Sequence, residues 1–176
     1  MKDIRTVEDI NIKEYDLEFK FQPKLTIELD KLNEDFTQNI LNEIILWKVN
    51  RYAWFDSVTI ELLNTLKQWT SELDELLTEQ LLEKLLGTKG VRIAMASTIL
   101  RFKNPSVYQI IDQRVYRIVY WVNMPTIKDK EASNVYIKYL KDLRSVCTKH
   151  NIPFEQSDRD LYALDKVINK GIKIKY

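Results

Sequence analysis

The sequence has one cysteine, Cys147, among its 176 residues. A single thiol cannot form an internal disulfide, and it cannot supply the cysteine ligands of a structural zinc site or an iron-sulfur cluster. A chain of this length buries enough apolar surface to be stable without such cross-links. The sequence therefore predicts one compact domain, or two small lobes with a shared core, that needs no metal or other cofactor and works in a reducing cytoplasm.

Long uncharged apolar runs are also missing. Residues 1–16 contain no apolar segment behind Lys2, and no later window has the length and composition of a membrane span. We therefore expect a protein that is neither embedded in a membrane nor secreted.

Neither sign of charge is in excess. The chain has 27 basic and 26 acidic residues, which gives a formal net charge of +1 at pH 7. This balance argues against an indiscriminate polyanion binder, whose surface would be basic throughout. Any surface that contacts nucleic acid must therefore be local.

Glycine and proline are scarce, with three and four copies, so long stretches can run as helix without interruption. The N-terminal part has a different pattern. Residues 17–29 alternate apolar and polar side chains on either side of Pro23, as a strand pair or an extended arm does. The predicted fold is mainly α-helical, with a β-hairpin or extended arm in residues 1–31 and a helical domain in residues 32–176.

Helical spacing of apolar residues recurs throughout that domain. Capping residues at the helix starts and Pro or Gly beyond the helix ends set the expected boundaries. The expected helices run from Asn33 to about Val49, over 62–69, from Ser71 to Gly87, over 91–102, from Asp112 onward, from Thr126 to before Pro153, and from Ser157 to Ile168.

Residues 83–118 form the most informative stretch: helix, glycine-containing hairpin, buried helix, proline-containing loop, then an aspartate at a helix start. Gly90 opens a helix, where backbone N–H groups and the helix dipole can hold a DNA phosphate whatever the base sequence. With Lys89, Val91 and Arg92 it makes a candidate DNA-backbone-binding hairpin.

Local positive charge strengthens this interpretation. Arg101 and Lys103, at the end of the buried helix, can add to the charge of the hairpin, although the whole chain is nearly neutral. The alternative is a plain turn between two packed helices, in which Gly87 is a C-cap and Gly90 a spacer. The hairpin by itself leaves both interpretations open.

The stretch resembles the helix-hairpin-helix (HhH-GPD) DNA glycosylase superfamily, as a small bacterial-type member without an iron-sulfur cluster. The matching elements are Gly90-Val91 in the hairpin, Ala96 in the buried helix, Ile111-Asp112 at the end of the loop, and Val115 and Arg117 after it. The resemblance implies a two-lobed helical bundle with Asp112 as the catalytic carboxylate at the mouth of the cleft between the lobes. It also implies a monomeric DNA-repair enzyme that grips double-stranded DNA by its backbone.

The departures from the family pattern narrow the expected chemistry. Arg92 replaces the second hairpin glycine, which removes flexibility but adds a possible phosphate contact. Ala94 stands where bifunctional members carry a Schiff-base lysine, so the resemblance implies a monofunctional glycosylase that hydrolyses the N-glycosidic bond of a damaged or modified base. Arg114 stands where many members have histidine, so no particular lesion carries over.

Asp112 and two aromatic residues complete the candidate site. Aspartate before a helix is a common N-cap in any protein, so capping is the alternative to catalysis for Asp112.

An enzyme that extrudes a base needs a surface on which the base stacks. Within the aromatic group of Trp47, Tyr52, Trp54 and Phe55, we favour Tyr52 and Trp54, because their segment lacks helical periodicity. Packing in the core is the alternative for these residues.

Two further functional hypotheses fit the sequence. One is a catalytically silent helix-hairpin-helix module that binds the DNA backbone, in which Asp112 only caps its helix. The other is a helical protein-interaction domain whose hairpin binds no nucleic acid, since the net charge is low and Arg92 departs from the pattern.

Overall fold

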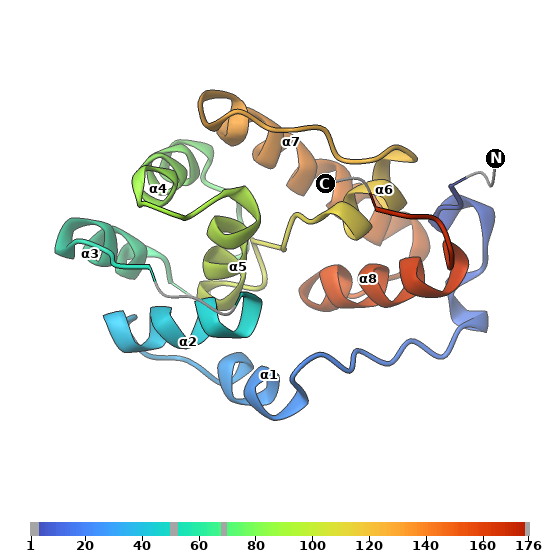
Figure 1. Cartoon of the computed structure of the whole chain (residues 1–176), viewed down its shortest axis with the longest axis horizontal. Coiled ribbons are helices and arrows are strands. Elements are labelled where there is room, and N and C mark those ends of the chain that lie inside the picture. Colours follow the sequence, from blue (N-terminus) through green and yellow to red (C-terminus); the bar gives the residue numbers. More distant parts are fainter. Residues whose placement is uncertain (1–3, 50–52, 68–69, 175–176) are drawn as a thin grey trace.

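The computed structural model describes residues 4–49, 53–67 and 70–174. This part of the chain is mainly α-helical and contains no β-strand (Figure 1). Three short 3₁₀ turns accompany the helices. The helices are α1 (Pro23–Asp30), α2 (Gln38–Lys48), α3 (Ser57–Thr65), α4 (Glu75–Gly87), α5 (Ile93–Lys103), α6 (Gln113–Tyr120), α7 (Asp129–His150) and α8 (Ser157–Ile168), and the turns are η1 (Val7–Asp9), η2 (Ile12–Glu14) and η3 (Phe154–Gln156).

Of the two alternatives for the N-terminal part, a β-hairpin or an extended arm, the described residues contain no β-hairpin. Residues 16–20 form an extended arm without regular secondary structure, but residues 23–30 form α1. Pro23 is the first residue of this helix, where its fixed φ is suitable and its missing N–H leaves no bond unmade. The buried residues Thr26 and Leu29 are three apart, as one face of a helix requires.

Most of the expected helices are present with shifted starts. α2 begins after Thr37, whose hydroxyl accepts a hydrogen bond from Ile40 N–H, and not after Asn33. α4 begins after Asp74, three residues later than Ser71. α6 begins after Asp112, as expected. The shifts occur because several polar residues near each start can cap, and packing selects one of them.

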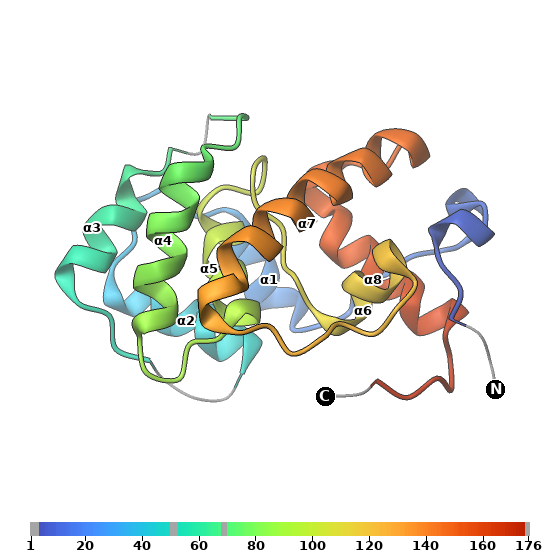
Figure 2. The ribbon, with the colours of Figure 1, turned by 90° about the horizontal axis from the view of Figure 1, so that it is seen from above.

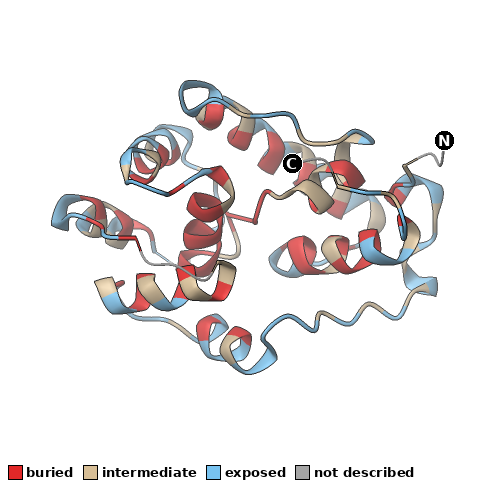
Figure 3. Ribbon diagram, in the orientation of Figure 1, coloured by how far each residue is buried: buried red, intermediate tan, exposed pale blue. Residues whose placement is uncertain are grey.

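Helix α5 lies at the centre of the molecule (Figures 1 and 2). It contacts α2 on one side and α4 on another, and nearly all of its residues are buried (Figure 3). α7 contacts both α4 and α6, and α6 packs against α8. Helices α1 to α5 therefore form one group and α6 with α8 a second, and the chain crosses between them after α5.

The loop between α5 and α6 is fixed by buried hydrogen bonds. Ile111 N–H donates to Ser97 Oγ at 3.2 Å, and the Tyr139 hydroxyl donates to Ile110 O at 2.8 Å. These bonds tie the loop to α5 on one side and α7 on the other. Asp112 follows directly, so its position is set by α5 and α7.

Within the described ranges, we find no helix that combines the length and the apolar character needed to cross a membrane.

Candidate functional site

The hairpin between α4 and α5 has the geometry of a tight turn. Gly90 has φ of +87°, in the left-handed region that favours glycine, although a Cβ there would meet no atom within 4 Å. Val91 N–H donates to Thr88 O at 3.0 Å and closes the turn. The backbone conformation, and not lack of space, therefore requires glycine at this position.

The four candidate hairpin residues divide into two sets. Lys89, Gly90 and Arg92 are exposed. Val91 is 2% exposed, and its N–H is already used within the turn, so it anchors the hairpin to the core. Only the exposed set can meet a DNA backbone.

Arg92 stands at the N-cap of α5 and makes no side-chain cap. Its guanidinium lies 3.2 Å from Asp129 at the start of α7, and both side chains are more than half exposed. Exposed ion pairs of this kind contribute little to stability. A phosphate can therefore replace Asp129 as the partner of Arg92 at small cost.

Arg101 and Lys103 do not add to the charge of the hairpin, contrary to expectation. Both are buried, at 2% and 4% exposure. Arg101 donates to Asp30, and Lys103 donates to Asn64 Oδ1 at 2.9 Å. Burial lowers the pKa of Lys103. These cations hold α1 and the loop before α2 in place and cannot contact DNA.

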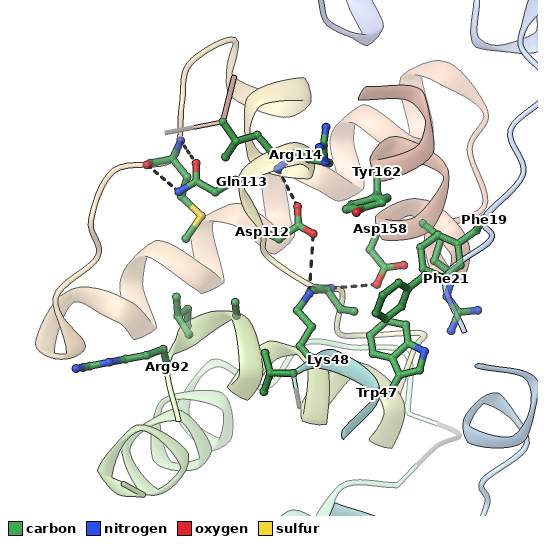
Figure 4. A pocket seen from close by; sticks show the side chains of 17 residues that line it. Phe19, Phe21, Trp47, Lys48, Arg92, Asp112, Gln113, Arg114, Asp158 and Tyr162 are labelled. Atoms are coloured by element: carbon green, nitrogen blue, oxygen red, sulfur yellow. Dashed lines mark hydrogen bonds and ion pairs between the residues drawn. The ribbon is translucent and has the colours of Figure 1, made fainter. Parts of the chain in front are cut away.

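Asp112 caps α6 with one oxygen and faces a pocket with the other (Figure 4). Its Oδ1 accepts hydrogen bonds from Arg114 N–H at 2.9 Å and Val115 N–H at 3.0 Å. Its Oδ2 lies 3.9 Å from Nζ of Lys48, the last residue of α2. Both side chains are 20% exposed, so the carboxylate is rigidly held and still accessible.

The pocket has a volume of about 580 Å³ and lies where the two groups of helices meet the N-terminal arm. A volume of this order suits a small-molecule-sized group. Its walls come from the arm, the end of α2, the start of α5, the loop around Asp112, α8 and the C-terminal segment. The lining residues are Phe19, Phe21, Trp47, Lys48, Val49, Arg92, Ile93, Ala94, Ile110, Asp112, Gln113, Arg114, Met124, Asp158, Arg159, Tyr162 and Ile174.

Packed aromatic rings form one wall of the pocket (Figure 4). Trp47 contacts Phe21 edge-on, with 5.3 Å between ring centroids, and Phe19 contacts Tyr162 at 6.0 Å. Trp47 also donates its indole N–H to Thr26 Oγ1 at 2.7 Å. This wall is therefore fixed before any ligand binds.

The sequence favoured two aromatic residues for base stacking, Tyr52 and Trp54. Trp54 is 80% exposed and does not line the pocket, and Tyr52 lies outside the described residues. Trp47 lines the pocket instead, because its helix turns it toward the arm. Two sequence features point to aromatic side chains beside the pocket: Trp47 belongs to the aromatic group considered above, and Phe19 and Phe21 alternate with polar residues.

Sequence reasoning also missed Lys48 and Asp158. Both residues line the pocket, but neither belongs to a sequence motif.

Arg117 has a structural role, because it is fully buried and its Nη2 donates to Asp165 of α8 at 2.8 Å. Cys147 is buried as well, and burial raises the pKa of its thiol to about 11. This thiol is not a nucleophile at neutral pH.

No protein-family model, curated protein sequence or solved structure matches the chain. In the described ranges, no three His, Cys, Asp or Glu side chains are placed to hold a metal ion together. The hairpin and the pocket are therefore the features from which a function can be inferred.

Proposed function

We propose that the chain is a helix-hairpin-helix DNA glycosylase that hydrolyses the N-glycosidic bond of a damaged or modified base in duplex DNA, without lyase chemistry. One observation carries the proposal: Asp112 is fixed at the start of α6 with Oδ2 turned toward an aromatic-walled pocket (Figure 4). Extrusion of the target base into such a pocket is what glycosidic-bond chemistry in a duplex requires.

Asp112 acts on the sugar in this proposal. As the base departs, positive charge develops on the deoxyribose, and a carboxylate beside it stabilises that charge. The same carboxylate orients the water that attacks the sugar. The two backbone N–H groups at Oδ1 keep the carboxylate in place, so little reorganisation is needed during the reaction.

The hairpin supplies the grip on DNA. Lys89 and Arg92 are exposed there, and α5 begins directly after Arg92. Arg92, Ile93 and Ala94 also line the pocket, so a backbone phosphate held at the hairpin lies beside the pocket entrance. Phosphate binding and base binding are thus adjacent, as base extrusion needs.

Ala94 offers no amine, which supports a monofunctional reaction. Lys48 is the amine that faces Asp112, with its Nζ 3.9 Å from Oδ2, and in this proposal it pairs with the carboxylate and does not act as a nucleophile. The base is therefore released by water and leaves an abasic site.

The test is excision from duplex oligonucleotides that each contain one damaged base, read as strand breaks after alkali. We expect the parent to release at least one base. Asp112→Asn should lose activity by about 100-fold or more, since Asn keeps the cap but not the charge. The matched control is Asp74→Asn, because Asp74 caps α4 by accepting from Leu77 N–H and lies outside the pocket.

A catalytically silent DNA-binding module is the second candidate. It is favoured by the same two hydrogen bonds, because capping of α6 accounts for the position of Asp112 without any reaction. Duplex binding with no excision by the parent, or full excision by Asp112→Asn, would support this module and contradict catalysis by Asp112. A protein-interaction domain would instead show no salt-dependent affinity for duplex DNA.

A further inference from the structure

Asp158, the second residue of α8, is a buried carboxylate that lines the pocket and is 2% exposed. Its Oδ2 accepts a long hydrogen bond from Ile110 N–H at 3.4 Å and lies 3.8 Å from Arg101 Nε. Its Oδ1 is buried and has no hydrogen-bond partner among the residues the structure describes. A buried acceptor without a partner lowers stability, so such atoms call for an explanation in terms of ligand or water.

The charge of Asp158 is balanced by its neighbours. Arg101 and Arg159 both donate to Asp30, and Arg101 also faces Asp158, so two guanidinium groups accompany two carboxylates. We name these four residues the floor cluster. A carboxylate oxygen accepts hydrogen bonds. The pocket therefore presents an acceptor that requires a donor.

A flat apolar surface lies beside this acceptor. Tyr162 lies one helical turn after Asp158 on α8, and its ring contacts Phe19, which packs with Phe21 and Trp47 in the aromatic wall (Figure 4). An aromatic wall beside one fixed polar atom suits a flat heterocycle whose edge carries an N–H donor.

We propose that Asp158 selects bases that carry an exocyclic amino group, as adenine- and cytosine-type bases do, over their oxo counterparts. The proposal rests on the glycosylase function above and adds its substrate class. An amino group donates one hydrogen to Oδ1, whereas an oxo group at the same place turns a lone pair toward a negative charge. Both the missing bond and this repulsion disfavour the oxo base.

The first experiment uses the whole chain and two free bases, adenine and hypoxanthine. Adenine has an amino group at C6 and a lone pair at N1, whereas hypoxanthine has an oxo group at C6 and a hydrogen on N1. Equilibrium dialysis measures the ratio of their affinities. We expect the parent to bind adenine about tenfold or more tightly than hypoxanthine, the usual size for a hydrogen bond to a charged group. A ratio near one in the parent overturns the proposal, whatever any variant does.

Two variants locate the preference. Asp158→Asn keeps the shape and can turn its amide N–H toward an oxo group, so the affinity ratio should fall to about one. Asp74→Asn is the matched control, because it makes the same chemical change at a helix cap outside both the pocket and the floor cluster. Its ratio should equal that of the parent. A preference retained in Asp158→Asn contradicts the assignment, provided that thermal unfolding shows that the variant is folded.

A duplex arm separates this proposal from the proposed function. Each duplex carries either adenine or hypoxanthine on a 2′-fluoroarabino sugar, which resists cleavage of the glycosidic bond. The base stands opposite an abasic site, so that neither base loses base-pairing hydrogen bonds when it is extruded. The same ratio should appear in duplex affinity. Selectivity for free bases without duplex binding would contradict the glycosylase function but support Asp158. Base excision without amino selectivity would support the function and contradict Asp158.

Discussion

The rim and the floor of the pocket carry similar numbers of charged side chains, but these side chains differ in how far they are buried. On the rim, which we define as Lys48, Arg92 and Asp112, the side chains are partly or largely exposed and the ion pairs are loose, at 3.9 Å for Lys48 with Asp112. In the floor cluster, Arg101 and Asp158 are 2% exposed and Arg159 donates to Asp30 at 2.6 Å.

This difference in burial gives the two regions different uses. A loosely paired, hydrated charge can exchange its partner for a phosphate or a sugar at little cost. A buried, bonded charge cannot, because removal of its partner leaves a desolvated charge. The rim therefore suits contact with DNA, and the floor cluster suits the fixed shape that recognises a base.

The largest expected effect comes from opening the floor cluster. Asp30→Asn removes the carboxylate that Arg101 and Arg159 share, and we expect a loss of about 2 kcal/mol in the free energy of unfolding, below the range for fully buried pairs because Asp30 is 29% exposed. Chemical denaturation at pH 7 measures the loss. If the loss in the free energy of unfolding were no larger than that expected for an exposed ion pair, the floor cluster would stabilise the fold no more than the pairs of the rim do.

The same variant has a defined pH dependence. Burial alone raises the pKa of Asp30, but the hydrogen bonds and charges of Arg159 and Arg101 outweigh it and hold the pKa below its ordinary value of 3.8. A lowered folded-state pKa contributes stability above the ordinary pKa and loses it as the pH falls through the folded value. The gap between parent and Asp30→Asn should be constant near neutral pH and close below about pH 4.

The next effect concerns the rim and DNA. Replacement of Lys89 and Arg92 by glutamate should weaken duplex binding about tenfold, equally for all sequences, and reduce the slope of log affinity against log salt by about 2. Fluorescence anisotropy over a salt series measures both. In the control variant, glutamate replaces two exposed lysines outside the hairpin and the pocket, Lys13 and Lys24. Equal losses in both double variants would contradict a hairpin grip.

A smaller effect separates the two roles of Asp112. Asp112→Ala removes the cap and should cost about 1 kcal/mol in stability, whereas Asp112→Asn keeps an oxygen for the cap and should change stability by less than about 0.5 kcal/mol. Thermal unfolding of both variants makes this comparison. Equal destabilisation by Ala and Asn would show that the negative charge on the rim, and not the cap, holds α6.

The last prediction is that no covalent intermediate between the protein and DNA can be trapped. Borohydride added during base excision should capture no protein–DNA adduct, because Ala94 has no amine and Lys48 is paired with Asp112. Denaturing gel electrophoresis detects an adduct. If one forms and disappears in Lys48→Met, the rim lysine has become a nucleophile and the reaction is not monofunctional.

Part of the site could be predicted from the sequence because its signals are local. A glycine with positive φ, a valine that anchors the turn and an aspartate before a helix act within a few residues of themselves, so the hairpin and the α6 cap were expected at Gly90 and Asp112. The aromatic wall was not predictable in this way. Trp47, Phe19 and Tyr162 lie in three separate segments, and no short-range pattern connects them.

The sequence by itself determined the helical class, the hairpin between α4 and α5, and the cap at Asp112. Each follows from spacing, turn geometry or hydrogen bonding among near neighbours. Only the tertiary structure decided that Pro23 starts a helix, that Trp54 faces solvent, and that Asp158 shares a pocket with Asp112. These outcomes depend on which distant surfaces pack together, because burial, and with it the behaviour of a charged or aromatic side chain, is a property of the assembled chain.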